Sequence, residues 1–118
     1  MTTHIVVGSR VDLNVTDNAD WLLQLRFVDD DGVAYDMSSD SFKMDVKTDV
    51  EEATPSLELT SGGGEIDDTD ADDGLLIVTI EKAALAAGSY VYDLIRVTGS
   101  AEEYLCGGFL AVNKGVTA

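Results

Sequence analysis

The sequence predicts an all-β domain, an immunoglobulin-like antiparallel β-sandwich with one short helical turn. Apolar runs alternate with clusters of Gly, Asp, Ser and Thr at short intervals, which is typical of a sandwich or barrel. Residues 75–80, LLIVTI, are apolar and β-branched, as in a strand. In residues 85–94, LAAGSYVYDL, a glycine is followed by Tyr90 at the start of an alternating run. This pattern indicates a tyrosine corner, in which the hydroxyl bonds the backbone a few residues upstream.

Period-two alternation defines the expected strands and their inner faces. Phe42, Met44 and Val46 lie on one face of a strand, and Lys43 and Asp45 lie on the other. The expected strands are residues 4–7, 11–15, 21–28, 34–37, 42–48, 56–60, 75–80, 90–97 and 103–112. We expect the following residues inside: Trp21, Leu23, Leu25, Phe42, Met44, Val46, Val78 and Tyr92.

A short helix is expected over residues 81–87, EKAALAA, before the tyrosine corner. Alanine favours a helix, and Gly88 is suited to end one. At 118 residues the chain is long enough for one hydrophobic core, so we expect one sandwich over residues 10–118. Residues 1–9 are expected to form an N-terminal arm or the first strand.

Charge restricts the class of partner. The chain has 23 acidic and 7 basic residues and a net charge of −16, which repels nucleic acid and anionic membranes. This acidity is consistent with solubility alone, with an outward surface on an assembly, or with a basic partner. No signal peptide or long apolar span is present, so we expect a protein made in a cytoplasm.

Candidate catalytic and metal-binding groups are few. Residues 67–73, DDTDADD, partly match a calcium loop, but the sixth position from Asp68 is Asp73 and the twelfth is Thr79. We expect an acidic loop tip and leave a weak cation site as the alternative. His4 is the only histidine, and Cys106 lies in an apolar run as a buried thiol. We therefore expect no enzyme activity, catalytic residue, cofactor or metal site.

Two apolar segments are candidate interaction surfaces. The first contains Ile5, Val6 and Val7, in a β-prone stretch that either adds to a neighbour's sheet or forms the protein's own first strand. The second contains Val91 and Ile95, which make the strand over residues 90–97 apolar on its outer face.

Several segments together resemble a known family. DGVAYDM at residues 31–37, FKMDV at 42–46, GSYVYDL at 88–94 and GGFLAV at 107–112 follow the order found in small tailed-phage virion proteins. That family is similar to the N-terminal domain of the siphophage baseplate upper protein. The resemblance spans roughly residues 10–115 and rests on turn and corner motifs.

The resemblance implies a non-enzymatic structural protein of a tailed-phage virion. Because the fibre or linker of a baseplate upper protein is missing, we expect a capsid decoration or cement protein that stabilises the head. The alternative is a tail, neck or baseplate adaptor. The expected partners are the major capsid protein or tail and neck proteins, together with further copies of the chain. A further alternative is an adhesion or carbohydrate-binding sandwich with Trp21 or Tyr35 as the stacking platform.

Overall fold

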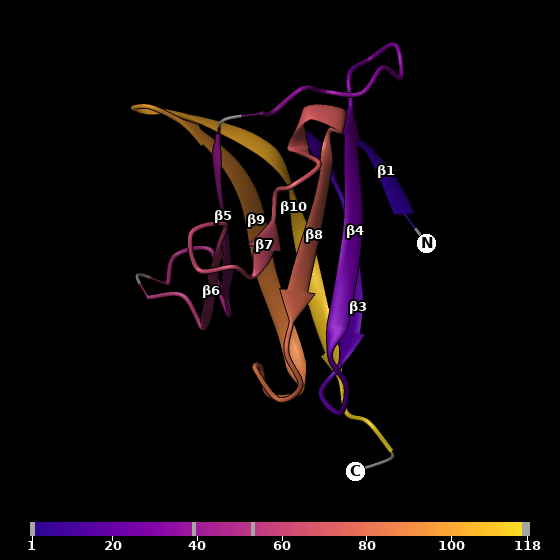
Figure 1. Cartoon of the computed structure of the whole chain (residues 1–118). Helices are drawn as coiled ribbons and strands as arrows, with labels where there is room; N and C mark the ends of the chain where they lie inside the picture. Colours follow the sequence, from indigo (N-terminus) through magenta and orange to yellow (C-terminus); the bar gives the residue numbers. More distant parts are fainter. Residues whose placement is uncertain (1, 39, 53, 117–118) are drawn as a thin grey trace.

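The alternating segments form ten strands and one short helix in the part of the chain that the structure describes, residues 2–38, 40–52 and 54–116. The structure is a computed structural model, shown in Figure 1. Its elements are β1 (Thr2–Val6), β2 (Ser9–Arg10), β3 (Leu13–Thr16), β4 (Trp21–Val28), β5 (Ser41–Lys47), β6 (Leu57–Thr60), β7 (Ile66–Asp67), η1 (Ala71–Asp73), β8 (Leu75–Ile80), β9 (Gly88–Thr98) and β10 (Ala101–Asn113).

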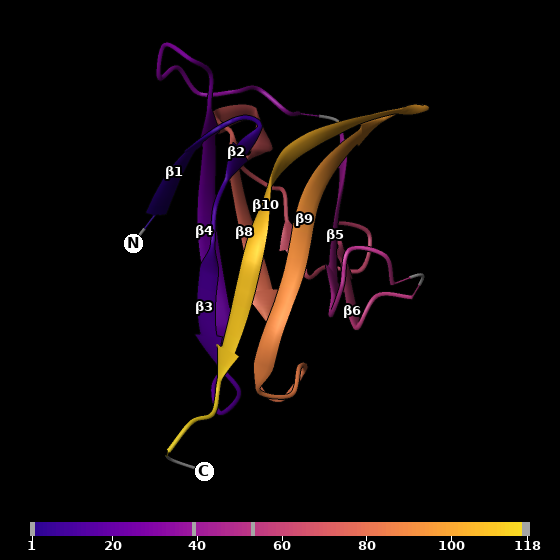
Figure 2. The same ribbon diagram turned by 180° about the vertical axis from the view of Figure 1, so that it is seen from behind.

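The strands form two sheets that pack against each other as a sandwich. One sheet has the order β1-β4-β8-β7. The other has the order β2-β10-β9-β5-β6, and β3 also pairs with β10 further along that strand. Figure 2 shows the second sheet from outside, with the long β9–β10 hairpin across its face. The all-β sandwich that the sequence predicts is therefore present.

The N-terminal segment contributes a strand to both sheets. Val7 donates its N–H to the Val28 carbonyl, and Gly8 donates to the Leu105 carbonyl, so the chain crosses between the sheets at this point. Gly8 has φ +90°, which favours glycine at the crossing. β1 pairs with β4 of the same chain, so it is a strand of the protein's own sheet in this structure.

The sheets are mixed, which corrects the expectation of antiparallel pairing throughout. β1 is parallel to β4, and β2 and β3 are parallel to β10. This arrangement arises because the N-terminal segment runs in the same direction as β4 in one sheet and then in the same direction as β10 in the other. The other strand pairs in the described part of the chain are antiparallel.

The tyrosine corner is confirmed. The Tyr90 hydroxyl donates to the Ala86 carbonyl at 2.7 Å, four residues upstream, and the Tyr90 ring is buried. The corner joins the loop after β8 to the start of β9. It holds the two sheets together at one end of the sandwich.

The helix expected over residues 81–87 is wrong. These residues form successive turns, and Ala83 has φ +62°, outside the helical region. The Lys82 N–H bonds Asp20 Oδ1 and the Ala83 N–H bonds the Asp17 carbonyl, so contacts with a distant loop replace helical hydrogen bonds. Seven residues are also too few for a stable isolated helix. The helical turn of the described residues is η1, which lies in the acidic loop.

The strand expected over residues 34–37 is also wrong. Ala34 makes an isolated bridge with Val28, and the segment then leaves the sheet. Tyr35 donates its N–H to the Phe27 carbonyl, and Met37 donates to the Ala71 carbonyl. The segment is therefore a hydrogen-bonded loop that places the Met37 side chain in the core.

The core lies between the sheets and contains the residues that the alternation places inside. Six of the eight expected core side chains are buried, and Trp21 and Leu23 are half-buried and pack against the same cluster. Each fully buried apolar side chain contributes about 1.5 to 3 kcal/mol. The six are Leu25, Phe42, Met44, Val46, Val78 and Tyr92.

Candidate interaction surface

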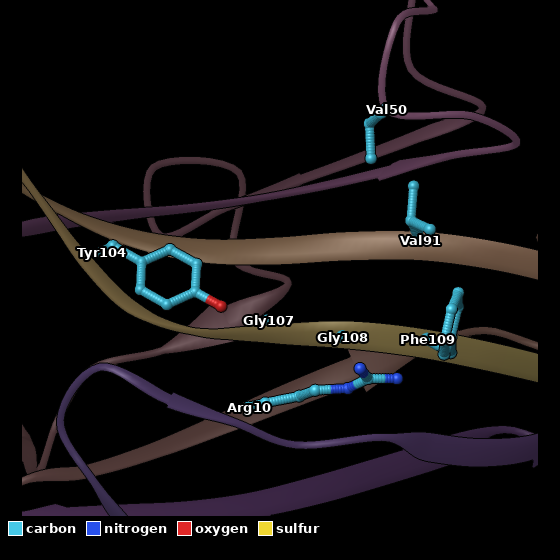
Figure 3. Close-up of a pocket in the computed structure, with 7 residues that line it drawn as sticks. All are labelled: Arg10, Val50, Val91, Tyr104, Gly107, Gly108 and Phe109. Carbon is cyan, nitrogen blue, oxygen red and sulfur yellow. The ribbon is translucent and has the colours of Figure 1, made fainter.

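A shallow groove crosses the outer face of the six-stranded sheet. It has a volume of about 310 Å³ and lies over β2, β10 and β9, beside the loop after β5 (Figure 3). Large apolar side chains are exposed around it, with Phe109 52%, Tyr104 46% and Val50 75% exposed. The lining residues are Arg10, Val50, Val91, Tyr104, Gly107, Gly108 and Phe109.

A β-bulge brings both aromatic rings to this face. Tyr104 and Phe109 are five positions apart, so in a regular strand they would point to opposite faces. The register of β10 against β9 shifts between Tyr104 and Cys106, which leaves Leu105 as an extra residue. Tyr104 then lies opposite Ile95, and Phe109 lies opposite Val91, on the same outer face.

Two glycines form the floor of the groove. A Cβ at Gly107 would lie 2.6 Å from the Tyr104 hydroxyl and 2.8 Å from the Tyr92 carbonyl oxygen. A Cβ at Gly108 would lie 2.7 Å from the Val11 carbonyl oxygen. Neither position has room for a side chain; Gly107 is buried under the Tyr104 ring, and Gly108 is half-buried between the two aromatic residues.

Arg10 supplies a positive charge at one side of the groove. Its guanidinium carbon lies 4.7 Å from the centre of the Phe109 ring, within cation–π range. Its Nε lies 3.2 Å from Asp12 Oδ1, which also accepts the Phe109 N–H at 2.9 Å. The hydrogen bond from Phe109, followed by that from Arg10, lowers the pKa of the Asp12 carboxyl. Asp12 therefore stays ionised and orients Arg10 over the ring.

Two carboxylates face each other beside the groove. Asp93 on β9 is directly opposite Asp45 on β5, and Gly107 is its neighbour on the other side. Burial first, and then the charge of Asp45, raises the pKa of Asp93. Lys43 Nζ lies 3.8 Å from Asp45 Oδ2 and offsets part of this repulsion.

We call the outward-facing side of β2, β10, β9 and β5 the docking face. Buried and outward-facing residues alternate along β5, which places Lys43 and Lys47 on the outward side. Together with Arg10 on β2, three of the seven basic residues of the chain lie on this face. The rest of the surface is correspondingly more acidic. The docking face comprises the groove residues together with Lys43, Asp45, Lys47, Asp93 and Ile95.

The structure separates the five candidate interface residues into two groups. Ile5 is buried in the core, Val6 is 40% exposed and Val7 is half-buried, all on or next to β1. Val91 and Ile95 are half-buried on the docking face, where Val91 lines the groove. Ile5 therefore serves the protein's own packing, whereas Val91 and Ile95 lie among exposed aromatic residues.

The two aromatic residues considered as carbohydrate platforms lie elsewhere. Trp21 is half-buried, and its Nε1 donates to Thr16 Oγ1 at 3.3 Å. The Tyr35 hydroxyl donates to the Glu103 carboxylate at 3.0 Å, and its ring lies under the Arg96 guanidinium. The exposed aromatic residues are instead Tyr104 and Phe109, which sequence alternation alone could not assign to one face without knowledge of the bulge.

The remaining candidates from the sequence are placed separately. In the acidic loop, Asp67 Oδ1 accepts hydrogen bonds from the N–H and the hydroxyl of Thr69, as in an Asx turn. His4 is exposed on β1 and Cys106 is buried. Within residues 2–38, 40–52 and 54–116, no group of three His, Cys, Asp or Glu side chains is placed to hold a metal ion. The same residues contain no helix long and apolar enough to cross a membrane.

Comparison of the sequence with family models and with curated proteins adds no relative. No family model matches the sequence, and no curated protein matches it either. The physical features of the docking face are therefore the basis for a functional proposal.

Proposed function

We propose that this protein is a non-enzymatic structural component of a tailed-phage virion that binds its neighbours through the docking face. The observation that carries the proposal is the pair of exposed rings, Tyr104 and Phe109, beside Arg10 on a chain of net charge −16. Protein interfaces are enriched in Tyr, Phe and Arg, and an exposed apolar patch of this kind marks an interaction site.

Within a virion, we propose the role of a head decoration or cement protein. The tyrosine corner and the segment GGFLAV in the second half of β10 carry the resemblance to small tailed-phage virion proteins. A decoration protein stabilises a shell by burying surface across its seams, and it needs no reaction chemistry. When the docking face is attached to the shell, the acidic loops face solvent, where their negative charge maintains solubility.

The test is the amount of this polypeptide in purified particles of the phage that encodes it, measured by quantitative mass spectrometry. We expect a molar amount comparable to that of the shell protein. A much smaller amount would contradict the decoration role and favour a tail, neck or baseplate adaptor. Complete absence from the particles would contradict the virion role.

A binding assay tests the surface. Purified protein added to particles that lack it should bind, and Phe109→Ser should weaken this binding by at least about tenfold. Leu22→Ser is the matched control, since Leu22 is an exposed apolar residue on β4 in the other sheet. Equal binding of both variants would contradict the docking face as the site.

A carbohydrate-binding role is the second candidate, because Tyr104 and Phe109 flank an open groove floored by glycine (Figure 3). Aromatic rings in such grooves stack on sugar rings. Binding on a glycan array that Tyr104→Ala abolishes would support this role. Failure of all glycans to bind would leave the structural role.

A further inference from the structure

The docking face consists of three cross-strand rows. The middle row runs from Arg10 on β2 through Gly107 and Asp93 to Asp45 on β5. On one side of the middle row, the next row contains Tyr104 on β10, Ile95 on β9 and Lys43 on β5. On the other side, Phe109 is next to Val91 and then Lys47. Each outer row is therefore apolar on β10 and β9 and cationic on β5.

We infer that a second copy of this chain occupies the docking face, packed sheet on sheet about a two-fold axis that runs parallel to the strands between β9 and β10. This inference shares with the proposed function only the assumption that the docking face is an interaction surface. With this axis, each cross-strand row faces the same row of the second copy, and the two rows run in opposite directions across the strands. The axis places β10 of one copy against β9 of the other and β2 against β5.

The contacts that follow are complementary. Tyr104 meets Ile95 of the second copy, and Phe109 meets Val91, so apolar groups cover apolar groups in both outer rows. In the middle row, Asp93 meets Gly107 of the second copy, where the neighbouring Tyr104 hydroxyl, which lies over Gly107, can donate a hydrogen bond to the carboxylate. Arg10 approaches Asp45 of the second copy and brings a cation to the two opposed carboxylates.

The other axis within the face is disfavoured by charge. A two-fold axis across the strands would place Asp93 opposite Asp93 and Asp45 opposite Asp45 of the second copy. Four carboxylates would then be desolvated together, which opposes association. The charges therefore select the axis parallel to the strands.

Net charge also favours this face over the rest of the surface. Two copies, each of charge −16, repel each other, and the docking face gathers three of the seven basic residues. Self-association through any more acidic surface would bring more like charges together. Salt screens the residual repulsion. We therefore expect association to strengthen as NaCl rises from about 0.05 to about 0.5 M, over which the Debye length falls from about 14 to about 4 Å.

The size of the face predicts a weak dimer. Four strands about 4.8 Å apart and three rows about 7 Å apart cover roughly 400 Å² of flat area per copy. This area is about half of the roughly 800 Å² per partner of a standard specific interface, so it fits a weak, transient contact. We therefore expect association over protein concentrations of roughly 10 μM to 1 mM.

The experiment is sedimentation velocity of the full chain at 0.5 M NaCl over that concentration range, roughly 10 μM to 1 mM. We expect the average mass to rise from 12.6 kDa toward twice that value. Phe109→Ser and Arg10→Asp should each weaken association by at least about tenfold, whereas Leu22→Ser should associate like the wild type. Thermal melting of each variant confirms that it folds.

Two outcomes would overturn the inference. The first is a wild-type chain that stays at 12.6 kDa at every concentration and salt level. If Phe109→Ser then still reduces particle binding, the face binds a different protein, and the proposed function stands without the dimer. The second is an association that Leu22→Ser abolishes and Phe109→Ser does not, which would move the contact to the other sheet.

Discussion

The Tyr90 hydroxyl donates to the Ala86 carbonyl at 2.7 Å, and this bond links the loop after β8 to the start of β9. The loop between them carries Leu85, whose side chain is buried in the core. The corner therefore determines where an apolar side chain enters the sandwich from a segment with no regular secondary structure.

Tyr90→Phe removes this hydrogen bond and leaves the ring in place. We expect a loss of about 1 kcal/mol in the free energy of unfolding, because the Ala86 carbonyl loses a partner. Urea denaturation at neutral pH measures the change. Tyr104→Phe is the control, because Tyr104 is exposed, and it should change stability by less than about 0.5 kcal/mol. Equal effects of the two variants would mean that the corner bond contributes nothing specific.

Asp93 on β9 lies directly opposite Asp45 on β5, and like charges in directly opposite positions destabilise a sheet. Burial and the Asp45 charge raise the pKa of Asp93, so folding favours its protonated form and stability falls as pH rises through that pKa. Asp93→Asn should therefore raise stability by about 0.2 to 1 kcal/mol at pH 7. Its advantage should disappear at acidic pH, where the wild-type carboxyl is protonated. Melting curves at both pH values, in dilute protein, decide this prediction.

Gly74 ends η1 with φ +76°, and a Cβ there would lie 2.4 Å from the Phe27 carbonyl oxygen. Gly74→Ala should therefore cost about 2 kcal/mol or more through backbone strain and displacement of β4. Gly64→Ala is the matched control, because Gly64 has φ +88° with nothing within 4 Å of the added Cβ. It should cost only the strain of positive φ, about 1 kcal/mol. Chemical denaturation of both variants separates steric clash from strain, and equal losses would contradict the clash.

Cys106 is fully buried beside the Tyr92 hydroxyl, and burial raises its pKa from 9.0 to about 11. Both states hold the thiol proton below pH 9, but the unfolded state loses it first above that pH. Stability contributed by the thiol is therefore present below pH 9 and is lost as pH rises toward 11. Native protein should react with a thiol reagent at pH 8 far more slowly than denatured protein, since burial keeps the native thiol protonated and shields it from the reagent.

Comparison with a cysteine-free variant tests the same group. Cys106→Ala should be less stable than the wild type near pH 8 but should lose less stability between pH 9 and 11. Parallel pH profiles for the two proteins would show that the thiol does not titrate in this range.

Alternation predicts the inner faces of the sandwich well, because a pleated strand with one buried face must place Phe42, Met44 and Val46 on the same side. It fails where the chain leaves the regular pleat. Leu105 is a bulge residue, and a bulge reverses the alternation on one side without any change in composition. Tyr104 and Phe109 therefore could not be placed together from the sequence.

Propensity also fails where distant contacts replace local ones. The alanine-rich residues 81–87 favour a helix, but Asp17 and Asp20 accept the backbone hydrogen bonds of Ala83 and Lys82. The outer-face residues Val91 and Ile95 were identifiable because they make their strand apolar on both faces. Arg10 was not, since its position depends on the pairing of β2 with β10.

The last prediction concerns β1. Ile5 is 2% exposed and pairs with Phe27 in the register of β1 and β4, whereas the adjacent Val6 is 40% exposed on the other face. Ile5→Ala should lower the free energy of unfolding of the isolated chain by about 2 to 4 kcal/mol, because it leaves a cavity in the core. Val6→Ala is the matched control and should cost less than about 1 kcal/mol. Denaturation of both variants in dilute solution measures the difference. If Ile5→Ala left the isolated chain as stable as the wild type but weakened its binding to particles, β1 would belong to a neighbouring subunit as an exchanged arm rather than to its own sheet.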